Sequence, residues 1–265
     1  MRLILIRHGE SHHTRDGRLA WVSGCTGLTE RGVAQSHQLA NRLAHTGELN
    51  DVTALLSSPV PRARQTAEIL ASRLPVPTIE TDCDLCELHP GAADGLSWEE
   101  YRSRFGIFDL QADPDRPFAP GGESWSEFVS RVGATLDRLA ERFAGQTVVA
   151  VSHAGFVVVS MLDRLHIPPA GERARLEPIH TSLTEWRVSA MVWRLERYND
   201  TSHLIDPPRG GTPPLLLTFV PNRLLSARAV VVTSRRAACR PEREPAAWHS
   251  EDLRGRRRPF DSRSP

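Results

Sequence analysis

The sequence contains no lysine, so all 33 of its basic residues are arginine. We attribute this absence to coding bias and give it no functional weight. Four cysteines in 265 residues are too few for a disulfide framework. The 33 basic and 32 acidic residues leave a net charge of +1, so no global field draws the chain to nucleic acid or to a membrane surface. A specific site must therefore carry the function.

Long apolar runs are also missing. None approaches the roughly 18 to 20 residues of a membrane-spanning helix, which argues against a transmembrane protein. The run Leu3 to Ile6 meets Arg7 and His8 before it reaches the length of a signal-peptide core. Together with the scarcity of cysteine, this favours a cytoplasmic protein. The hydrophobic content of 40% is still enough for a sizeable core, which excludes a fibrous or wholly disordered chain.

Charge and proline divide the chain in two. Residues 206–265 hold 12 arginines against 6 acidic residues and 9 of the 20 prolines, so their net charge is +6 and residues 1–205 carry −5. Such composition is typical of a linker and tail. We predict a folded domain over 1–205 and a largely disordered tail over 206–265, in which the apolar runs 215–220 and 229–232 can add an edge strand.

Within residues 1–205, short apolar runs alternate with helical patterns. This predicts an α/β fold, a three-layer α/β/α sandwich with a mainly parallel sheet covered on both faces. Strands are expected at 3–6, 52–57, 147–151, 182–188 and 190–197. One helix is expected to start at Thr29 and a second to follow the strand 52–57, and two more are expected at 123–144 and 154–165. In the first helix the expected inward stripe is Val33, Leu39, Ala40, Leu43 and Ala44.

Arg7-His8-Gly9-Glu10 follows the first strand, and the carboxyl ends of strands are where open α/β sheets bind ligands. A neutral histidine there can act as a nucleophile through one ring nitrogen while a backbone carbonyl holds the proton of the other. The neighbouring arginine offers a planar fork of donors that matches phosphate oxygens. The alternative is an ordinary Arg-His pair at the surface.

Three further segments strengthen the first interpretation. Arg62 opens the helix after the second strand, where it can reach an anion bound over the sheet. His153 follows a third strand and precedes a helix whose free N–H groups favour an anion, and the small residues after it permit close backbone approach. Glu87 lies in the loop 85–91 and offers a carboxyl group.

In this order, the segments resemble the histidine phosphatase superfamily, which includes cofactor-dependent phosphoglycerate mutases and many phosphatases. The resemblance spans residues 1–205 and rests on residues 7–11, 27–32, 57–67, the Glu87 loop, 120–124 and 152–155. It implies that His8 becomes phosphohistidine, that Arg7, Arg62 and His153 bind the phosphoryl group, and that Glu87 protonates the leaving oxygen. It further implies substrate contacts at Thr14, Cys25 and Thr26, although the segment 24–27 that holds the last two is explained equally well by formation of a turn.

The chain also departs from the mutases. They usually carry tryptophan and asparagine where His13 and Thr14 stand here, and their arginine-rich substrate segment has only a weak match at 101–104. We therefore expect a phosphomonoesterase acting on small phosphorylated metabolites. The alternatives are a mutase-like isomerase and a decayed phosphate- or protein-binding module, the latter disfavoured because the site residues are intact. His12 and His13 either line the pocket mouth or are exposed loop histidines.

No cofactor and no metal are expected. Cys83 and Cys86 have the spacing of half a zinc or redox site, but no second pair accompanies them. The expected partner is a small phosphomonoester. Membrane is excluded and nucleic acid is not expected. A homodimer is allowed.

Overall fold

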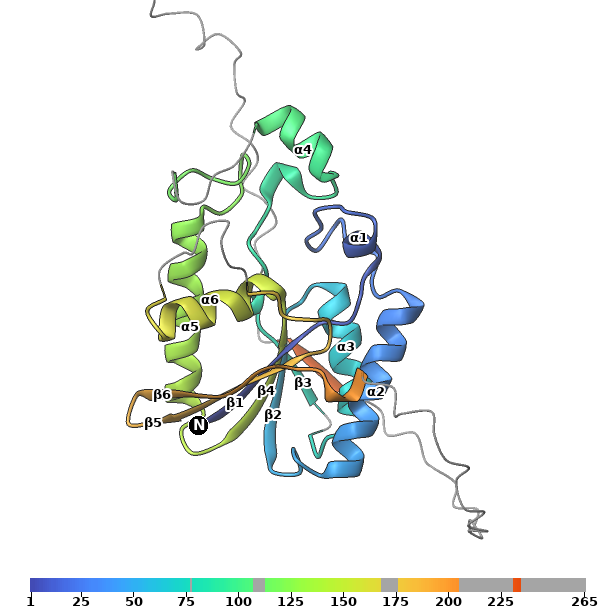
Figure 1. The fold of residues 1–265 in the computed structure, drawn as a ribbon, viewed down its shortest axis with the longest axis vertical. Helices are drawn as coiled ribbons and strands as arrows, with labels where there is room; N and C mark the ends of the chain where they lie inside the picture. Colours follow the sequence, from blue (N-terminus) through green and yellow to red (C-terminus); the bar gives the residue numbers. More distant parts are fainter. Residues whose placement is uncertain (77, 107–112, 168–175, 205–230, 235–265) are drawn as a thin grey trace, which may run out of the picture.

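A central β-sheet organises the computed structural model (Figure 1), which describes residues 1–76, 78–106, 113–167, 176–204 and 231–234. The strands are β1 (Arg2–Arg7), β2 (Val52–Ser57), β3 (Thr78–Thr81), β4 (Thr147–Ser152), β5 (Leu183–Ser189), β6 (Val192–Asp200) and β7 (Val231–Ser234). The helices are α1 (His12–Arg15), α2 (Glu30–Thr46), α3 (Pro61–Ala71), α4 (Trp98–Phe105), α5 (Trp125–Arg142) and α6 (Ala154–Arg164), with 3-10 turns at Cys83–Leu85, Gly91–Ala93 and Ser202–Leu204.

The sheet is mainly parallel. Among the described residues it has seven strands in the order β6-β5-β1-β4-β2-β3-β7. Strands β1, β4, β2, β3 and β7 are parallel, whereas β5 runs antiparallel to both β1 and β6. The expected α/β class with a mainly parallel sheet is confirmed.

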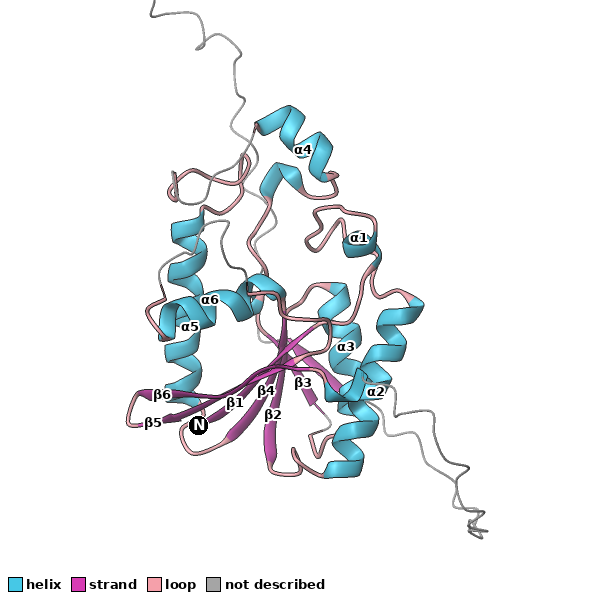
Figure 2. Cartoon of the chain, viewed as in Figure 1, coloured by secondary structure: helices cyan, strands magenta, loops and turns pink. Residues whose placement is uncertain are grey.

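Helices cover both faces of the sheet (Figure 2). Successive residues of a strand point to opposite faces, and β1 shows the consequence. Leu3 and Leu5 pack in the cluster that includes the apolar faces of α5 and α6, whereas Ile4 and Ile6 pack in the cluster formed with α2 and α3. Both faces of β1 are therefore buried, which explains why its sequence is a continuous apolar run. The predicted three-layer sandwich is confirmed.

Helix α2 begins where the sequence predicts. The side chain of Thr29 accepts a hydrogen bond from the Gly32 N–H at 3.0 Å, so it caps the first turn. Two residues of the expected inward stripe were wrong: Val33 is 37% exposed and Ala44 is exposed. The buried face of the helix includes Gln35 instead, and the side-chain carbonyl of this residue accepts a hydrogen bond from the Glu10 N–H.

The other elements match the predicted ranges with small differences. Helix α5 spans 125–142 rather than 123–144, and Leu74 packs beside the core after α3 has ended. The apolar run 229–232 overlaps β7, which pairs with β3 at the edge of the sheet. The run 215–220 and the expected disordered end from Arg235 lie outside the described residues, and the domain boundary near 206 stays a prediction.

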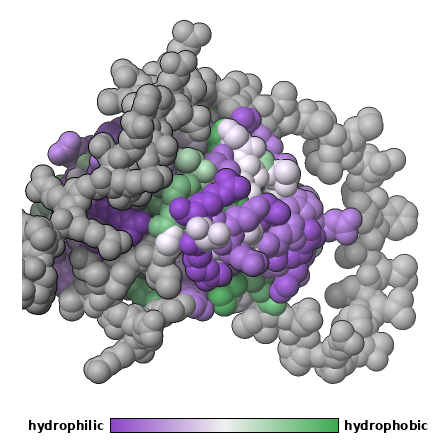
Figure 3. Space-filling view, turned by 90° about the horizontal axis from the view of Figure 1, so that it is seen from above, coloured by the Kyte–Doolittle hydropathy of each residue, from purple (hydrophilic) through white to green (hydrophobic). Residues whose placement is uncertain are grey.

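The end of the molecule that carries α1 and α4 is shown from above in Figure 3, where much of the visible coloured surface is hydrophilic. Helices of the described residues are too short or too polar to cross a membrane. The functional site lies toward this end, above the carboxyl edge of the parallel strands.

Candidate active site

Two neighbouring strands bring His8 and His153 together. β1 and β4 are parallel and pair Arg7 with Ser152, so the next residue of each strand emerges at the same edge of the sheet. The His8 N–H donates to the Ser152 carbonyl at 3.0 Å, and the two imidazole centroids lie 5.1 Å apart. The predicted meeting of these histidines follows from sheet topology alone.

The tautomer of His8 is set by the backbone. Its Nδ1 donates to the Gly9 carbonyl at 2.7 Å, which leaves the lone pair on Nε2. Burial lowers the pKa of His8 well below its ordinary value, and the charges of Arg62 and Arg7 lower it further. The ring is 3% exposed. His8 is therefore neutral at pH 7, and its Nε2 lone pair has the chemistry that a nucleophile needs.

Arg62 lies over the nucleophile from the first turn of α3. Pro61 occupies the first position of that helix, where its missing N–H costs nothing. The Arg62 Nε donates to His8 Nε2 at 3.1 Å and its Nη1 donates to the Ala20 carbonyl at 2.8 Å. One turn later, Thr66 accepts the Gly9 N–H at 3.1 Å. Helix α3 thus fixes both the arginine and the loop that carries His8.

His153 stands at the start of α6 and is completely buried. Its Nε2 lies 2.9 Å from the Ser58 hydroxyl, and its Nδ1 has no hydrogen-bond partner among the described residues. Burial lowers the pKa of His153 well below its ordinary value, and the charge of Arg62 adds to the effect. His153 is therefore neutral at pH 7.

Arg7 completes the basic wall at the end of β1. Its Nη1 donates to the Pro178 carbonyl at 2.5 Å, while its Nε is buried and finds no hydrogen-bond partner in the part of the chain that the structure describes. Burial is the main cause that lowers the pKa of Arg7, and the Glu87 carboxylate opposes it. The guanidinium stays charged at all relevant pH values.

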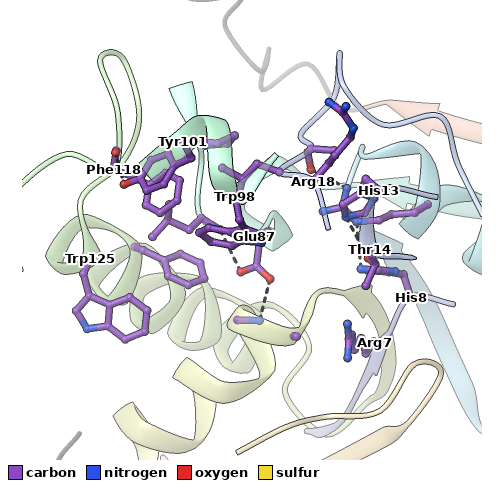
Figure 4. A pocket seen from close by; sticks show the side chains of 18 of the residues that line it. Arg7, His8, His13, Thr14, Arg18, Glu87, Trp98, Tyr101, Phe118 and Trp125 are labelled. Carbon is purple, nitrogen blue, oxygen red and sulfur yellow. Dashed lines mark hydrogen bonds between the residues drawn. The ribbon is translucent and has the colours of Figure 1, made fainter. Parts of the chain in front are cut away.

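Glu87 points to the start of α6 (Figure 4). Its Oε2 accepts the Gly155 N–H at 2.9 Å and its Oε1 accepts the Leu88 N–H at 3.1 Å. A Cβ at position 155 would collide with Oε1, so only glycine leaves room for this approach. The close backbone approach expected after His153 is present, and the group that approaches the backbone there is the Glu87 carboxylate.

The loop that carries Glu87 is held by Arg131 on α5, a residue that sequence reasoning missed. The Arg131 Nη1 donates to the carbonyls of Asp84 and Cys86 at 2.7 and 3.1 Å, and Nη2 donates to the Glu87 carbonyl at 3.2 Å. Its Nε and Nη2 also form a two-pronged ion pair with Glu123, each at 2.8 Å. An arginine inside a helix, seven residues beyond the 120–124 motif, carries no signal of this role in the sequence.

Arg7, His8, Arg62 and Glu87 line a cavity of about 510 Å³, whereas His153 and Arg131 do not belong to its lining. One wall is polar and basic, with Arg7, His8, His13, Thr14 and Arg62. The opposite wall is largely aromatic, and Figure 4 shows Glu87 between the two. Its members are Leu88, Trp98, Tyr101, Phe118, Trp125 and Phe128. Such a cavity can hold a phosphoryl group at one end and the rest of a small molecule at the other.

The structure separates the remaining candidates. Thr14 and His13 line the cavity, whereas His12, Cys25 and Thr26 do not belong to its lining. Cys25 packs instead with Val60 and Cys86 in a small buried cluster, so a substrate contact there stays a prediction without support from this geometry.

Two arginines that the sequence did not predict as site residues also line the cavity. Arg18 and Arg102 line the cavity, although the segment around Arg102 appeared to be only a weak match to a substrate-binding segment. Arg102 has no ion pair within the described part of the chain. Arg18 donates to the Gly95 carbonyl at 2.9 Å.

No group of three or more histidine, cysteine, aspartate or glutamate residues within the described ranges is arranged to hold a metal ion. The side chains of the site supply a neutral imidazole with a free Nε2 lone pair, two guanidinium groups, a second imidazole and one carboxyl group.

Comparison with known proteins agrees with this arrangement. Residues 3–201 match the family model "Histidine phosphatase superfamily (branch 1)". The chain is 29% identical over 207 residues to a metal-independent phosphoserine phosphatase of Arabidopsis thaliana, covering 76% of this chain and 82% of the relative. It is 32% identical over 216 residues to a probable phosphoglycerate mutase of Yersinia pestis, covering 78% and 96%.

Among solved structures, YhfR of Bacillus stearothermophilus superposes with a TM-score of 0.65 at 26% identity, covering 76% of this chain and 98% of that one. The family match covers β2 to β6, all of β1 except its first residue, the basic wall and the Glu87 loop, whereas β7 lies outside it. The chain belongs to the histidine phosphatase superfamily, branch 1.

Proposed function

We propose that this protein is a metal-independent phosphomonoesterase that hydrolyses small phosphorylated metabolites through a phosphohistidine on His8. One observation carries the proposal. The buried, neutral His8 keeps its Nε2 lone pair because Nδ1 donates to Gly9, and Arg62 stands 3.1 Å from that same nitrogen. A nucleophile and a phosphate-binding cation thus share one position.

In the first step, the phosphoryl group lies between Arg7, Arg62 and His153, whose donors stabilise the charge on its equatorial oxygens. The His8 Nε2 forms a bond to phosphorus while the bond from phosphorus to the ester oxygen breaks. Glu87, protonated for this step, gives its proton to that oxygen, and the alcohol leaves. The two N–H groups that hold Glu87 keep its carboxyl group beside the cavity.

In the second step, the ionised Glu87 takes a proton from a water molecule. The water oxygen bonds to phosphorus, the bond to His8 Nε2 breaks, and inorganic phosphate forms. His8 returns to its neutral state with Nδ1 still bonded to Gly9, and Glu87 regains its proton for the next cycle.

A phosphoglycerate mutase-like isomerase is the second candidate. It is favoured by the relative named a probable mutase and by Arg18 and Arg102, which give the cavity two cations beyond the basic wall. These cations can hold a second anionic group of the substrate. A mutase must also retain its phosphorylated intermediate and exclude water, whereas a phosphatase must admit water.

The decisive experiment measures phosphate release from a panel of phosphomonoesters, with a chelator present and without a bisphosphoglycerate primer. We expect wild-type protein to release phosphate and quenched enzyme to carry acid-labile phosphate. His8→Ala should abolish both, while His37→Ala, on an exposed position of α2, should change neither. Residual turnover above a few per cent in His8→Ala would refute the nucleophile. Interconversion of phosphoglycerates only after priming, without phosphate release, would favour the isomerase.

A further inference from the structure

A third imidazole lies beside the nucleophile and is not used in the mechanism above. The ring of His180 has its centroid 5.8 Å from that of His8, at an interplanar angle of 51°. His180 precedes β5, so it reaches the site from the segment that follows the β4-α6 unit. The sequence did not single it out, because it belongs to none of the recognised motifs.

The segment around His180 is tied directly to the Arg7-His8 backbone. The Thr181 N–H donates to the Arg7 carbonyl at 2.9 Å, and the Pro178 carbonyl accepts from the Arg7 side chain. Together with the hydrogen bond from the Arg7 N–H to the Ser182 carbonyl at 3.3 Å, these contacts fix the distance between residue 180 and His8. The position of the His180 ring is therefore a property of the built site and not of a free loop.

Backbone strain also occurs at this point. Thr181 has a φ of +60°, a left-handed conformation that a β-branched residue adopts only under constraint. Its hydroxyl donates to the His180 carbonyl at 2.7 Å and lies 2.9 Å from His203 Nε2. These bonds offset the strain, and the unusual backbone conformation sets where the preceding side chain, His180, lies.

The imidazole of His180 has an unused polar atom. Its Nε2 is buried and has no partner among the described residues, which is unfavourable for a polar group. Two other buried atoms without partners, Arg7 Nε and His153 Nδ1, belong to residues that surround His8. A phosphoryl group supplies several strong acceptor oxygens, so one ligand bound at His8 can accept hydrogen bonds from more than one of these residues.

Thr14 is poorly placed to supply this contact. It lines the cavity after the Arg-His-Gly-Glu motif, but its Oγ1 lies 2.9 Å from the Ser11 hydroxyl and 3.2 Å from His13 Nε2. Its hydroxyl is thus engaged within its own loop.

Burial, aided by the charge of Arg7, lowers the pKa of His180 to about 3, so the ring is neutral at pH 7 and carries one proton.

We propose that His180 is a phosphoryl ligand whose Nε2–H donates a hydrogen bond to the phosphoryl group carried by His8. The inference rests on the proposed function for the identity of the ligand. It adds a donor from the segment that precedes β5, whereas Arg62 reaches the nucleophile from α3.

The test measures binding of inorganic phosphate to the full chain by calorimetry, so that it does not depend on turnover. Glutamine can place an N–H near the position of the imidazole Nε2, whereas leucine cannot donate. We expect His180→Leu to weaken phosphate binding by about tenfold to a hundredfold. His180→Gln should stay within about threefold of wild type, and the exposed His37→Leu should match wild type.

Equal phosphate affinity in His180→Leu and wild type would overturn the inference, as would equal weakening in the leucine and glutamine variants. Should His180→Leu not fold, ¹⁵N-histidine NMR of the wild-type protein decides: phosphate must shift the Nε2 resonance of His180, and an unmoved resonance refutes the contact. A wild-type protein that binds phosphate but hydrolyses no monoester would instead refute the proposed function.

Discussion

Glu87 has its carboxylate fixed by main-chain N–H groups of Leu88 and Gly155 rather than by other side chains. Its location therefore depends on the backbone of two segments, its own loop and the start of α6. Two substitutions probe the carboxyl group in different ways: one changes its chemistry, and the other changes its position.

Glu87→Gln removes the proton that the leaving group needs. An alkoxide leaves poorly without protonation, whereas an activated phenolate leaves well, so the loss should depend on the substrate. We expect turnover of an alkyl phosphate to fall by about a hundredfold or more and that of p-nitrophenyl phosphate by less than about tenfold. Parallel assays on both substrates give the ratio. Equal losses would assign Glu87 a structural role.

Gly155→Ala moves the same carboxyl group without altering it, because the new Cβ would occupy the place of Oε1. Alanine is the better helix former, so the fold itself should not suffer. We expect the alkyl phosphate to lose at least about tenfold in turnover while the melting temperature is kept. Gly133→Ala on α5 is the matched control, since its Cβ meets no atom closer than 3.4 Å. Full activity in Gly155→Ala would show that Glu87 need not occupy the observed position.

At the scale of secondary-structure elements, α5 acts as the support of the acid loop. The partly buried Arg131 joins three carbonyls of that loop to the carboxylate of Glu123, which directly precedes the cap of α5. The ion pair is largely shielded, with side chains 14% and 10% exposed. Removal of the arginine leaves a buried carboxylate without its partner.

Arg131→Met should therefore destabilise the protein by about 3 to 5 kcal/mol and lower activity in proportion to the displacement of Glu87. Adding Glu123→Leu should recover part of the stability, since no unpaired charge remains, but not the activity. Urea unfolding and alkyl phosphate turnover of both variants separate the two effects. Recovery of both together would mean that Arg131 acts through stability alone.

The sequence predicts the elements that carry the motifs, because their buried strands are continuous apolar runs and proposed site residues such as His8 and His153 directly follow them. His8 and His153 could be placed together since parallel strands end at one edge. Arg131 and His180 could not be found, because each acts through a long-range contact that no local pattern marks. Val33 was wrongly assigned to the buried face of α2, because apolar spacing alone does not reveal that the polar Gln35 is buried and accepts the Glu10 N–H.

At the scale of the whole molecule, β7 is the one described strand beyond residue 206, and it pairs with β3 at the sheet edge. Every proposed site residue precedes it. We expect chains shortened to 1–205 and to 1–234 to keep phosphatase kcat/KM within about twofold of the full chain. The shorter one leaves the β3 edge unpaired and should aggregate at lower temperature. Light scattering on heating checks this, and loss of activity in 1–205 would move the domain boundary.

Several half-buried histidines make stability depend on pH. Burial lowers the pKa of His13 and His180 to about 3 and that of His203 to about 4, with the charges of Arg62, Arg7 and Arg42 respectively adding to it. The unfolded chain binds these protons near pH 6.5, before the folded protein does. Stability should therefore be full above about pH 6.5 and fall as pH drops toward 4.

Urea midpoints between pH 7.5 and 4.5 measure this slope. His203→Leu should flatten it, because one proton taken up on unfolding is lost, whereas the exposed His37→Leu should keep the wild-type slope. Identical slopes in all three proteins would show that His203 is not held neutral by its burial.

The pairing of β1 with β4 has a consequence for how the protein acquires activity during refolding. Arg62 contacts His8 across 54 residues of chain and His153 contacts Ser58 across 95. Closing loops of such length is slow and entropically costly, and central parallel strands must find each other before either contact exists. Intermediates with formed helices but an incomplete sheet would have no phosphate site. Recovery of catalytic turnover should therefore lag behind recovery of the helical circular dichroism signal. Added phosphate should not increase the rate of refolding before β1 and β4 have paired.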